Sequence, residues 1–94
     1  MTTEILETKR KRLHMRSIRR GIKEMDIILS AFSEAHLAGL DAAALTTYDA
    51  LLSENDHDLY QWVTGQVREP EPYHVLMDLV REGAFGLTKP KNLK

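Results

Sequence analysis

Four histidines are the residues of this 94-residue chain best suited to metal binding, and the chain has no cysteine. His14, His36, His57 and His74 fall on or beside four different predicted helices, and no pair has the H-x-x-x-H spacing of a metal site. His36 lies on an apolar helical stripe, so we expect a packed, hydrogen-bonded ring. P-loop, G-x-S-x-G and G-x-G-x-x-G motifs are absent. The sequence therefore predicts a protein that is not an enzyme, with no metal and no cofactor of its own.

Cationic side chains are concentrated in residues 9–23, which contain no acid. The eight are Lys9, Arg10, Lys11, Arg12, Arg16, Arg19, Arg20 and Lys23. Residues 24–67, in contrast, contain acids and neither Lys nor Arg. A basic helix face could bind nucleic-acid phosphates. The pI of about 6.4, the acidic segment that follows and the lack of aromatic residues within the basic run argue against it. We do not expect a nucleic-acid partner, and a nucleic-acid-binding helical module is kept as the alternative function.

The stretch R-S-I-R-R-G-I-K-E, residues 16–24, contains the point where the charge changes sign. Gly21 lies between two predicted helices, where a positive φ or a close backbone approach favours glycine. One interpretation is a routine helix boundary, with Glu24 at the positive end of the next helix. The other is a bare corner, at which Arg20 and Glu24 make charge-assisted hydrogen bonds with a partner. Taken alone, these residues favour the first interpretation.

The elements that position these residues are all predicted to be helices, because no stretch alternates like a strand. The first helix, residues 3–17, has a thin apolar set: Ile5, Leu6, Leu13 and Ile18. The second ends near Gly39, and its apolar face recurs every three or four residues. That face comprises Ile22, Met25, Ile28, Leu29, Phe32, His36 and Leu40. We expect the first helix to lie against the others rather than at the centre.

Three further helices follow. Asp41 is the predicted N-cap of a third, and the sequence S-E-N-D at 53–56 breaks it and caps a fourth, which stops at Gly65. Residues 67–72 contain two prolines and are predicted to be a loop before a fifth helix, which Gly83 closes. The inward residues are predicted to be Leu45, Tyr48, Leu51, Leu52, Leu59, Trp62, Val63, Tyr73, Leu76, Leu79 and Val80. The sequence thus predicts an all-α, compact five-helix bundle-like domain, residues 1–83, and a flexible basic tail, residues 84–94.

Composition is that of a globular domain, with 43% hydrophobic and 29% charged residues. No apolar run approaches the roughly 20 residues that span a bilayer, so no membrane association is expected. The first residues lack the order of a secretory signal, and we expect a cytoplasmic protein that is a monomer when free.

Two sequence blocks resemble a known family. R-R-G-I-K-E-M-D-I-I-L-S-A-F, residues 19–32, resembles the signature R-G-x-x-E-x-D of the SdhE family of flavinylation factors. L-L-S-E-N-D-H-D-L-Y-Q-W-V, residues 51–63, resembles that family's L-L-x-x-x-D-x-D-L-x-x-W. The chain length, the five helices and the spacing of the blocks also fit, and the resemblance covers about residues 9–83.

The resemblance implies a non-enzymatic assembly factor. Such a factor binds the flavoprotein subunit of succinate dehydrogenase, or in some bacteria of fumarate reductase, and promotes covalent attachment of FAD. The residues that match the family's motifs are the expected partner-binding residues: Arg19, Arg20, Gly21, Glu24, Asp26, Asp56 and Asp58. Trp62 also matches but is expected in the core. We expect no tight binding of free FAD, because the chain offers no phosphate cradle.

One departure concerns the residue before the corner. Many relatives carry an aromatic residue where this chain has Ile18, so a stacking role is not carried over. A toxin–antitoxin-type or generic helical interaction protein is a further alternative.

Overall fold

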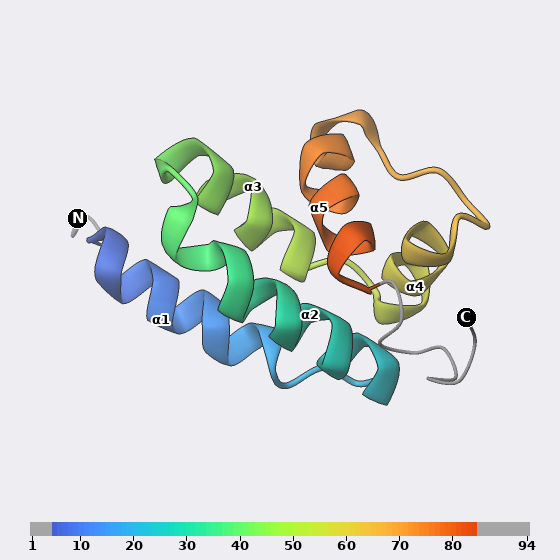
Figure 1. Cartoon of the computed structure of the whole chain (residues 1–94), viewed down its shortest axis with the longest axis horizontal. Helices are drawn as coiled ribbons and strands as arrows, with labels where there is room; N and C mark the ends of the chain where they lie inside the picture. Colours follow the sequence, from blue (N-terminus) through green and yellow to red (C-terminus); the bar gives the residue numbers. More distant parts are fainter. Residues whose placement is uncertain (1–4, 85–94) are drawn as a thin grey trace.

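The computed structural model describes residues 5–84, and this part of the chain is all-α. Five α-helices are joined by short connections, with two 3-10 turns between them (Figure 1). The elements are α1 (Leu6–Ser17), α2 (Lys23–His36), η1 (Leu37–Gly39), α3 (Ala42–Leu52), α4 (Asp56–Thr64), η2 (Glu71–Tyr73) and α5 (His74–Ala84). The predicted fold class is confirmed.

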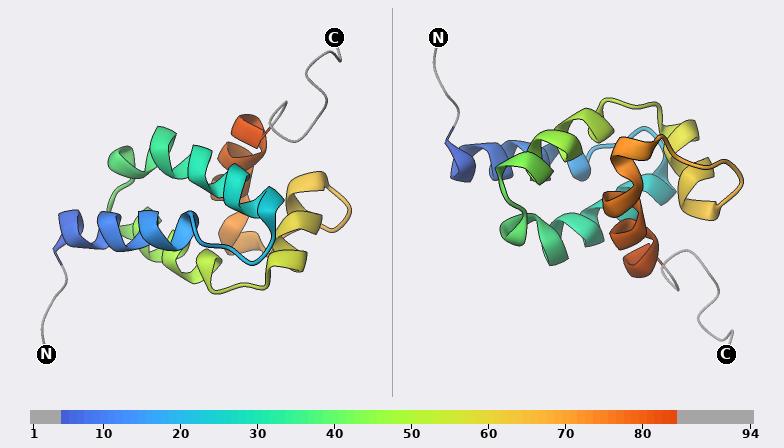
Figure 2. Two further views of the ribbon diagram at one scale, coloured as in Figure 1. Left: turned by 90° about the horizontal axis from the view of Figure 1, so that it is seen from below. Right: turned by 90° about the horizontal axis from the view of Figure 1, so that it is seen from above.

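The first three helices lie roughly side by side. α1 and α2 run in opposite directions, and α3 packs along α1 (Figure 1). α5 crosses α2 steeply and also contacts α4, which lies at the end of the molecule where α1 connects to α2 (Figure 2). This arrangement places the connection from α1 to α2 beside the connection from α3 to α4.

The helix boundaries follow local chemistry. Asp41 caps α3 by accepting from the Ala44 N–H at 2.8 Å, and Asn55 caps α4 by accepting from the His57 N–H at 2.7 Å. Gly65 ends α4 in the left-handed conformation at φ 82°. These predicted boundaries are confirmed.

The core is built mainly from the apolar faces of α2, α3, α4 and α5, joined by Leu13 of α1, Leu37 of η1 and Tyr73 of η2. Met25, Ile28, Leu29 and Phe32 of α2 are buried, as the spacing predicts. Inward residues of the later helices are buried as well: Leu45, Tyr48, Leu51, Leu52, Leu59, Trp62, Tyr73, Leu76 and Val80. Val63 and Leu79 are half-buried against this core. Trp62 is therefore a core residue, as expected.

The expected apolar set of α1 is largely wrong. Leu13 is fully buried, but Ile5, Leu6 and Ile18 are exposed. α1 begins at Leu6 rather than at residue 3, and residues 1–4 lie outside the described part. The helix is held by Leu13, Ser17 and polar contacts, so a search for apolar periodicity alone misreads it.

Two predictions near the C-terminal end also need correction. Glu71 and Pro72 of the predicted loop, together with Tyr73 of the predicted fifth helix, form a 3-10 turn, since proline is tolerated in the first turn. Gly83 does not close α5, which continues to Ala84, a buried residue. The rest of the expected tail, residues 85–94, lies outside the described residues.

Candidate functional site

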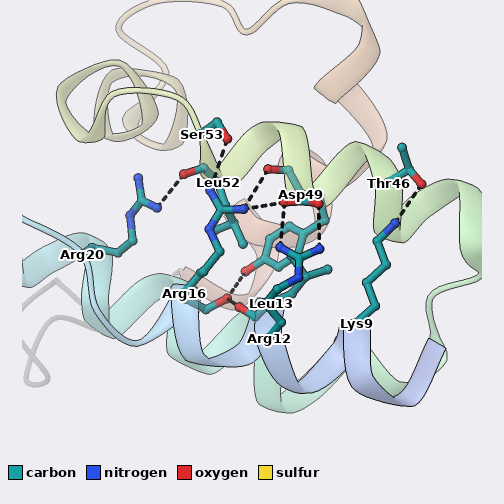
Figure 3. A network of polar contacts seen from close by, with 11 residues as sticks. Lys9, Arg12, Leu13, Arg16, Arg20, Thr46, Asp49, Leu52 and Ser53 are labelled. Carbon is teal, nitrogen blue, oxygen red and sulfur yellow. Dashed lines mark hydrogen bonds and ion pairs between the residues drawn. The ribbon is translucent and has the colours of Figure 1, made fainter. Parts of the chain in front are cut away.

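Arg20, at the connection between α1 and α2, points into the molecule. Its Nε donates to Asp56 Oδ1 at 2.7 Å, its Nη1 to the Leu52 carbonyl at 2.7 Å and its Nη2 to the Glu54 carbonyl at 3.1 Å. Only 10% of the side chain is exposed. Figure 3 shows the guanidinium directed toward Leu52, at the end of α3. A cation is favoured there, since the last carbonyls of a helix lack partners within it.

The connection between α1 and α2, residues 18–22, is called the corner here, and two carboxylates hold its backbone. The Arg20 N–H donates to Asp26 Oδ1, and the Gly21 N–H donates to Asp56 Oδ2 at 2.7 Å. Asp56 therefore binds Arg20 and Gly21 at once, one oxygen to each. Asp26 lies in the first turn of α2 and Asp56 begins α4, so the corner is fixed to two helix N-termini.

Glycine is favoured at position 21 by a close approach and not by an unusual φ. Among the described residues Gly65 alone has a positive φ. A Cβ added to Gly21 would lie 3.1 Å from Asp56 Oδ2, closer than ordinary van der Waals contact. The approach that the sequence suggested thus exists, and it is made by the chain's own Asp56.

The outer side of the corner is open to solvent. Arg19, Gly21, Lys23 and Glu24 are exposed, as is Asp58 on α4. Within residues 5–84 the Arg19 side chain has no ion-pair or hydrogen-bonding partner, so its charge faces solvent. A hollow of about 280 Å³ beside the corner is lined by Met15, Arg16, Arg19 and Arg20.

The remaining cations of α1 mostly bind α3 (Figure 3). Arg12 and Arg16 both pair with Asp49, Arg12 at 2.9 Å, and Lys9 donates to Thr46 at 3.1 Å. Hydrogen bonds from Arg12 lower the pKa of the Asp49 carboxyl below its ordinary value. Two arginines of the basic helix thus share the one acidic side chain of α3, Asp49. This use of its cations gives no support to the nucleic-acid alternative.

The histidines do not gather. His14 Nδ1 lies 2.6 Å from Ser33 Oγ, the His36 ring packs on Phe32, and His57 is exposed. Within the described residues no three acidic, His or Cys side chains are grouped so that they could hold a metal ion. No helix in the same range is long and apolar enough to cross a membrane.

Comparison with known proteins identifies the family. The family model described as "Flavinator of succinate dehydrogenase" matches residues 11–84, which include the whole corner and both sequence blocks. The chain belongs to this family. Both the expected resemblance and the range of residues that carries it are therefore confirmed.

The curated relatives agree. The chain is 48% identical over 63 residues to "Succinate dehydrogenase assembly factor 2, mitochondrial" of Meyerozyma guilliermondii, covering 67% of this chain and 47% of the relative. It is 40% identical over 82 residues to the protein of the same name from Danio rerio, covering 84% and 52%. The chain thus spans about half the length of these relatives. They are named as mitochondrial proteins, so the expectation of a cytoplasmic protein is wrong.

The sequence did not predict two groups of buried, hydrogen-bonded polar side chains in this protein. Tyr48 Oη lies 2.6 Å from Ser17 Oγ inside the core, and burial raises the pKa of Tyr48 to about 12. The only signal was a serine at the inward spacing of α1, four residues after Leu13.

The second cluster surrounds Glu69, which is 5% exposed although it lies in the connection before α5. Its carboxylate accepts from Arg81 at 2.8 Å and lies 2.8 Å from His74 Nδ1. Hydrogen bonds from Arg81 lower its pKa to about 2. A glutamate before a proline in a polar stretch is expected to lie at the surface. No sequence signal therefore indicated that Glu69 is buried.

Proposed function

We propose that the chain is a non-enzymatic assembly factor that docks on the flavoprotein subunit of succinate dehydrogenase and promotes covalent attachment of FAD to it. The observation that carries the proposal is the exposed, side-chain-free corner at Gly21, within the segment that the family model matches. Names of the relatives, which describe assembly of succinate dehydrogenase, support the choice of partner.

The seven expected partner-binding residues take two roles in this proposal. Four are exposed and are proposed to contact the partner directly: Arg19, Gly21, Glu24 and Asp58. Three are half-buried and are proposed to shape the docking corner from beneath: Arg20, Asp26 and Asp56. Charge-assisted hydrogen bonds donated by Arg19 and accepted by Glu24 would give the contact its orientation.

The proposed mechanism is conformational. The attachment chemistry belongs to the flavin and to the partner's own site, and the factor holds that site in a reactive arrangement. A corner fixed to the starts of α2 and α4 suits this role, because a rigid surface loses little entropy on binding. Exposed apolar side chains of Met15, Ile18 and Ile27 add surface that a partner could cover.

The test is the variant Gly21→Arg, with Gly39→Arg as its matched control. Both glycines are exposed, and a Cβ at Gly39 would meet nothing within 4 Å. Gly21→Arg is expected to keep the helical fold, checked by circular dichroism, and to abolish covalent flavin on the coexpressed flavoprotein subunit. Flavin fluorescence of that subunit on a denaturing gel measures the result. Normal flavinylation with Gly21→Arg, or equal loss with Gly39→Arg, would overturn the site assignment.

A further inference from the structure

We infer that Asp56 is the positioning residue of the docking corner and that it explains why position 21 is glycine. The inference rests on the proposed function, because it concerns the same surface. Asp56 Oδ2 accepts the Gly21 N–H at 2.7 Å, while Oδ1 accepts Arg20 Nε at 2.7 Å. With 16% of its side chain exposed, the carboxylate lies under the corner rather than on its outer face.

The geometry separates two reasons for a glycine. If a partner closed directly on position 21, any side chain there would clash with the partner. In the free protein, however, a Cβ already lies 3.1 Å from Asp56 Oδ2, so even alanine must push this carboxylate away by a few tenths of an ångström. Such a shift lengthens the bonds that hold Arg20 and Gly21. The glycine therefore protects an internal contact.

Asp56 also explains why the two sequence blocks occur together. Its partners are in the first block, and the carbonyls of Leu52 and Glu54 that bind the same arginine are in the second. Glu54 in turn accepts from Tyr73 Oη at 2.8 Å, which extends the connection to η2. The second block thus supplies the support for the corner that the first block forms.

The first experiment measures, without any partner protein, the hydrogen bond by which Asp56 holds the Gly21 N–H. Amide hydrogen exchange of Gly21, measured by NMR on the full chain, is expected to be about tenfold faster in Asp56→Asn than in the wild type. Asparagine has the same size but only one acceptor oxygen for the two donors. Asp58→Asn, two residues further along α4, is the matched control and should leave this amide unchanged. Equal exchange rates in the wild type and Asp56→Asn would overturn the inference.

The second experiment is a double-mutant cycle on binding to the purified flavoprotein subunit. Gly21→Ala is expected to weaken binding about fivefold in the wild-type background, because it displaces the carboxylate. In Asp56→Ala, where the carboxylate is gone, the same substitution should change affinity by less than about twofold. Should Asp56→Ala fail to fold, Asp56→Ser completes the cycle.

The outcomes distinguish the two proposals. Equal losses from Gly21→Ala in both backgrounds would show that the partner requires the glycine and would overturn the role of Asp56. Absence of any binding by the wild type would instead overturn the proposed function. The exchange experiment would still show whether Asp56 holds the Gly21 N–H.

Discussion

Replacement of Glu69 by glutamine is expected to destabilise the fold in a manner that depends on pH. The carboxylate is 5% exposed and accepts hydrogen bonds from Arg81 at 2.8 and 3.3 Å. Its pKa falls from 4.5 to about 2 in the folded chain, chiefly because of Arg81. At about 1.4 kcal/mol per pKa unit, this shift of about 2.5 units corresponds to at most about 3.5 kcal/mol of free energy of unfolding at pH 7. Glu69→Gln should lose about 2 to 3 kcal/mol.

The direction in which stability changes with pH follows from the lowered pKa of Glu69. A carboxyl group whose folded pKa lies below its unfolded value stabilises the fold fully above the unfolded pKa. For Glu69 this contribution is lost as the pH falls from about 4.5 toward about 2. By pH 3.5 about 1.4 kcal/mol of it is gone. The difference between wild type and Glu69→Gln should therefore shrink by about that amount between pH 7 and pH 3.5.

Urea unfolding followed by circular dichroism at the two pH values measures these differences. Glu71→Gln is the matched control, since Glu71 lies two residues further along and is exposed, and it should change stability by less than about 0.5 kcal/mol. A Glu69→Gln effect of equal size at both pH values would refute the electrostatic explanation. Loss of stability by Glu71→Gln to the same degree would refute the role of burial.

Three further substitutions test the packing by urea unfolding at pH 7. Tyr48→Phe should cost about 1 kcal/mol, because it removes the hydrogen bond to Ser17 while Ser17 keeps its bond to a backbone carbonyl; no change would contradict the buried pairing. Gly65→Ala should cost about 1 kcal/mol at its φ of 82°, whereas Gly39→Ala should be neutral, and equal effects would count against the left-handed cap. Met77→Ala should cost about 2 to 5 kcal/mol, since Met77 is 1% exposed, and a loss under 1 kcal/mol would contradict its place in the core.

Much of the fold could be predicted because its signals are local. The caps of α3 and α4 depend on side chains two or three residues from the N–H groups they accept. The core face of α2 is visible as an apolar repeat with a helical period. The start of α4 at Asn55 and its end at Gly65 likewise depend on single residues. For such features the sequence contains the whole physical cause.

The site was predicted only in part. Sequence reasoning found the corner and its glycine, but it placed Arg20 in a partner's reach, whereas the side chain binds Asp56 and the end of α3. Whether a guanidinium faces inward depends on what lies opposite it. Here the opposite group is 36 residues away in the chain, and nothing in the local pattern reveals it.

The same reason explains why the polar contacts of α1 were not predicted. The sequence suggested that the cations of α1 face solvent or a ligand, yet Arg12 and Arg16 both pair with Asp49 of α3. Burial of Glu69 likewise depends on Arg81 of α5.

The sequence by itself determined the helices, their caps and the family, because these depend on neighbouring residues and on motifs. Only the tertiary structure decided which charges face solvent at the corner and which hold it from beneath. The physical reason is that a charge is buried when a distant element supplies its partner, and that partner is brought near by the packing of whole helices.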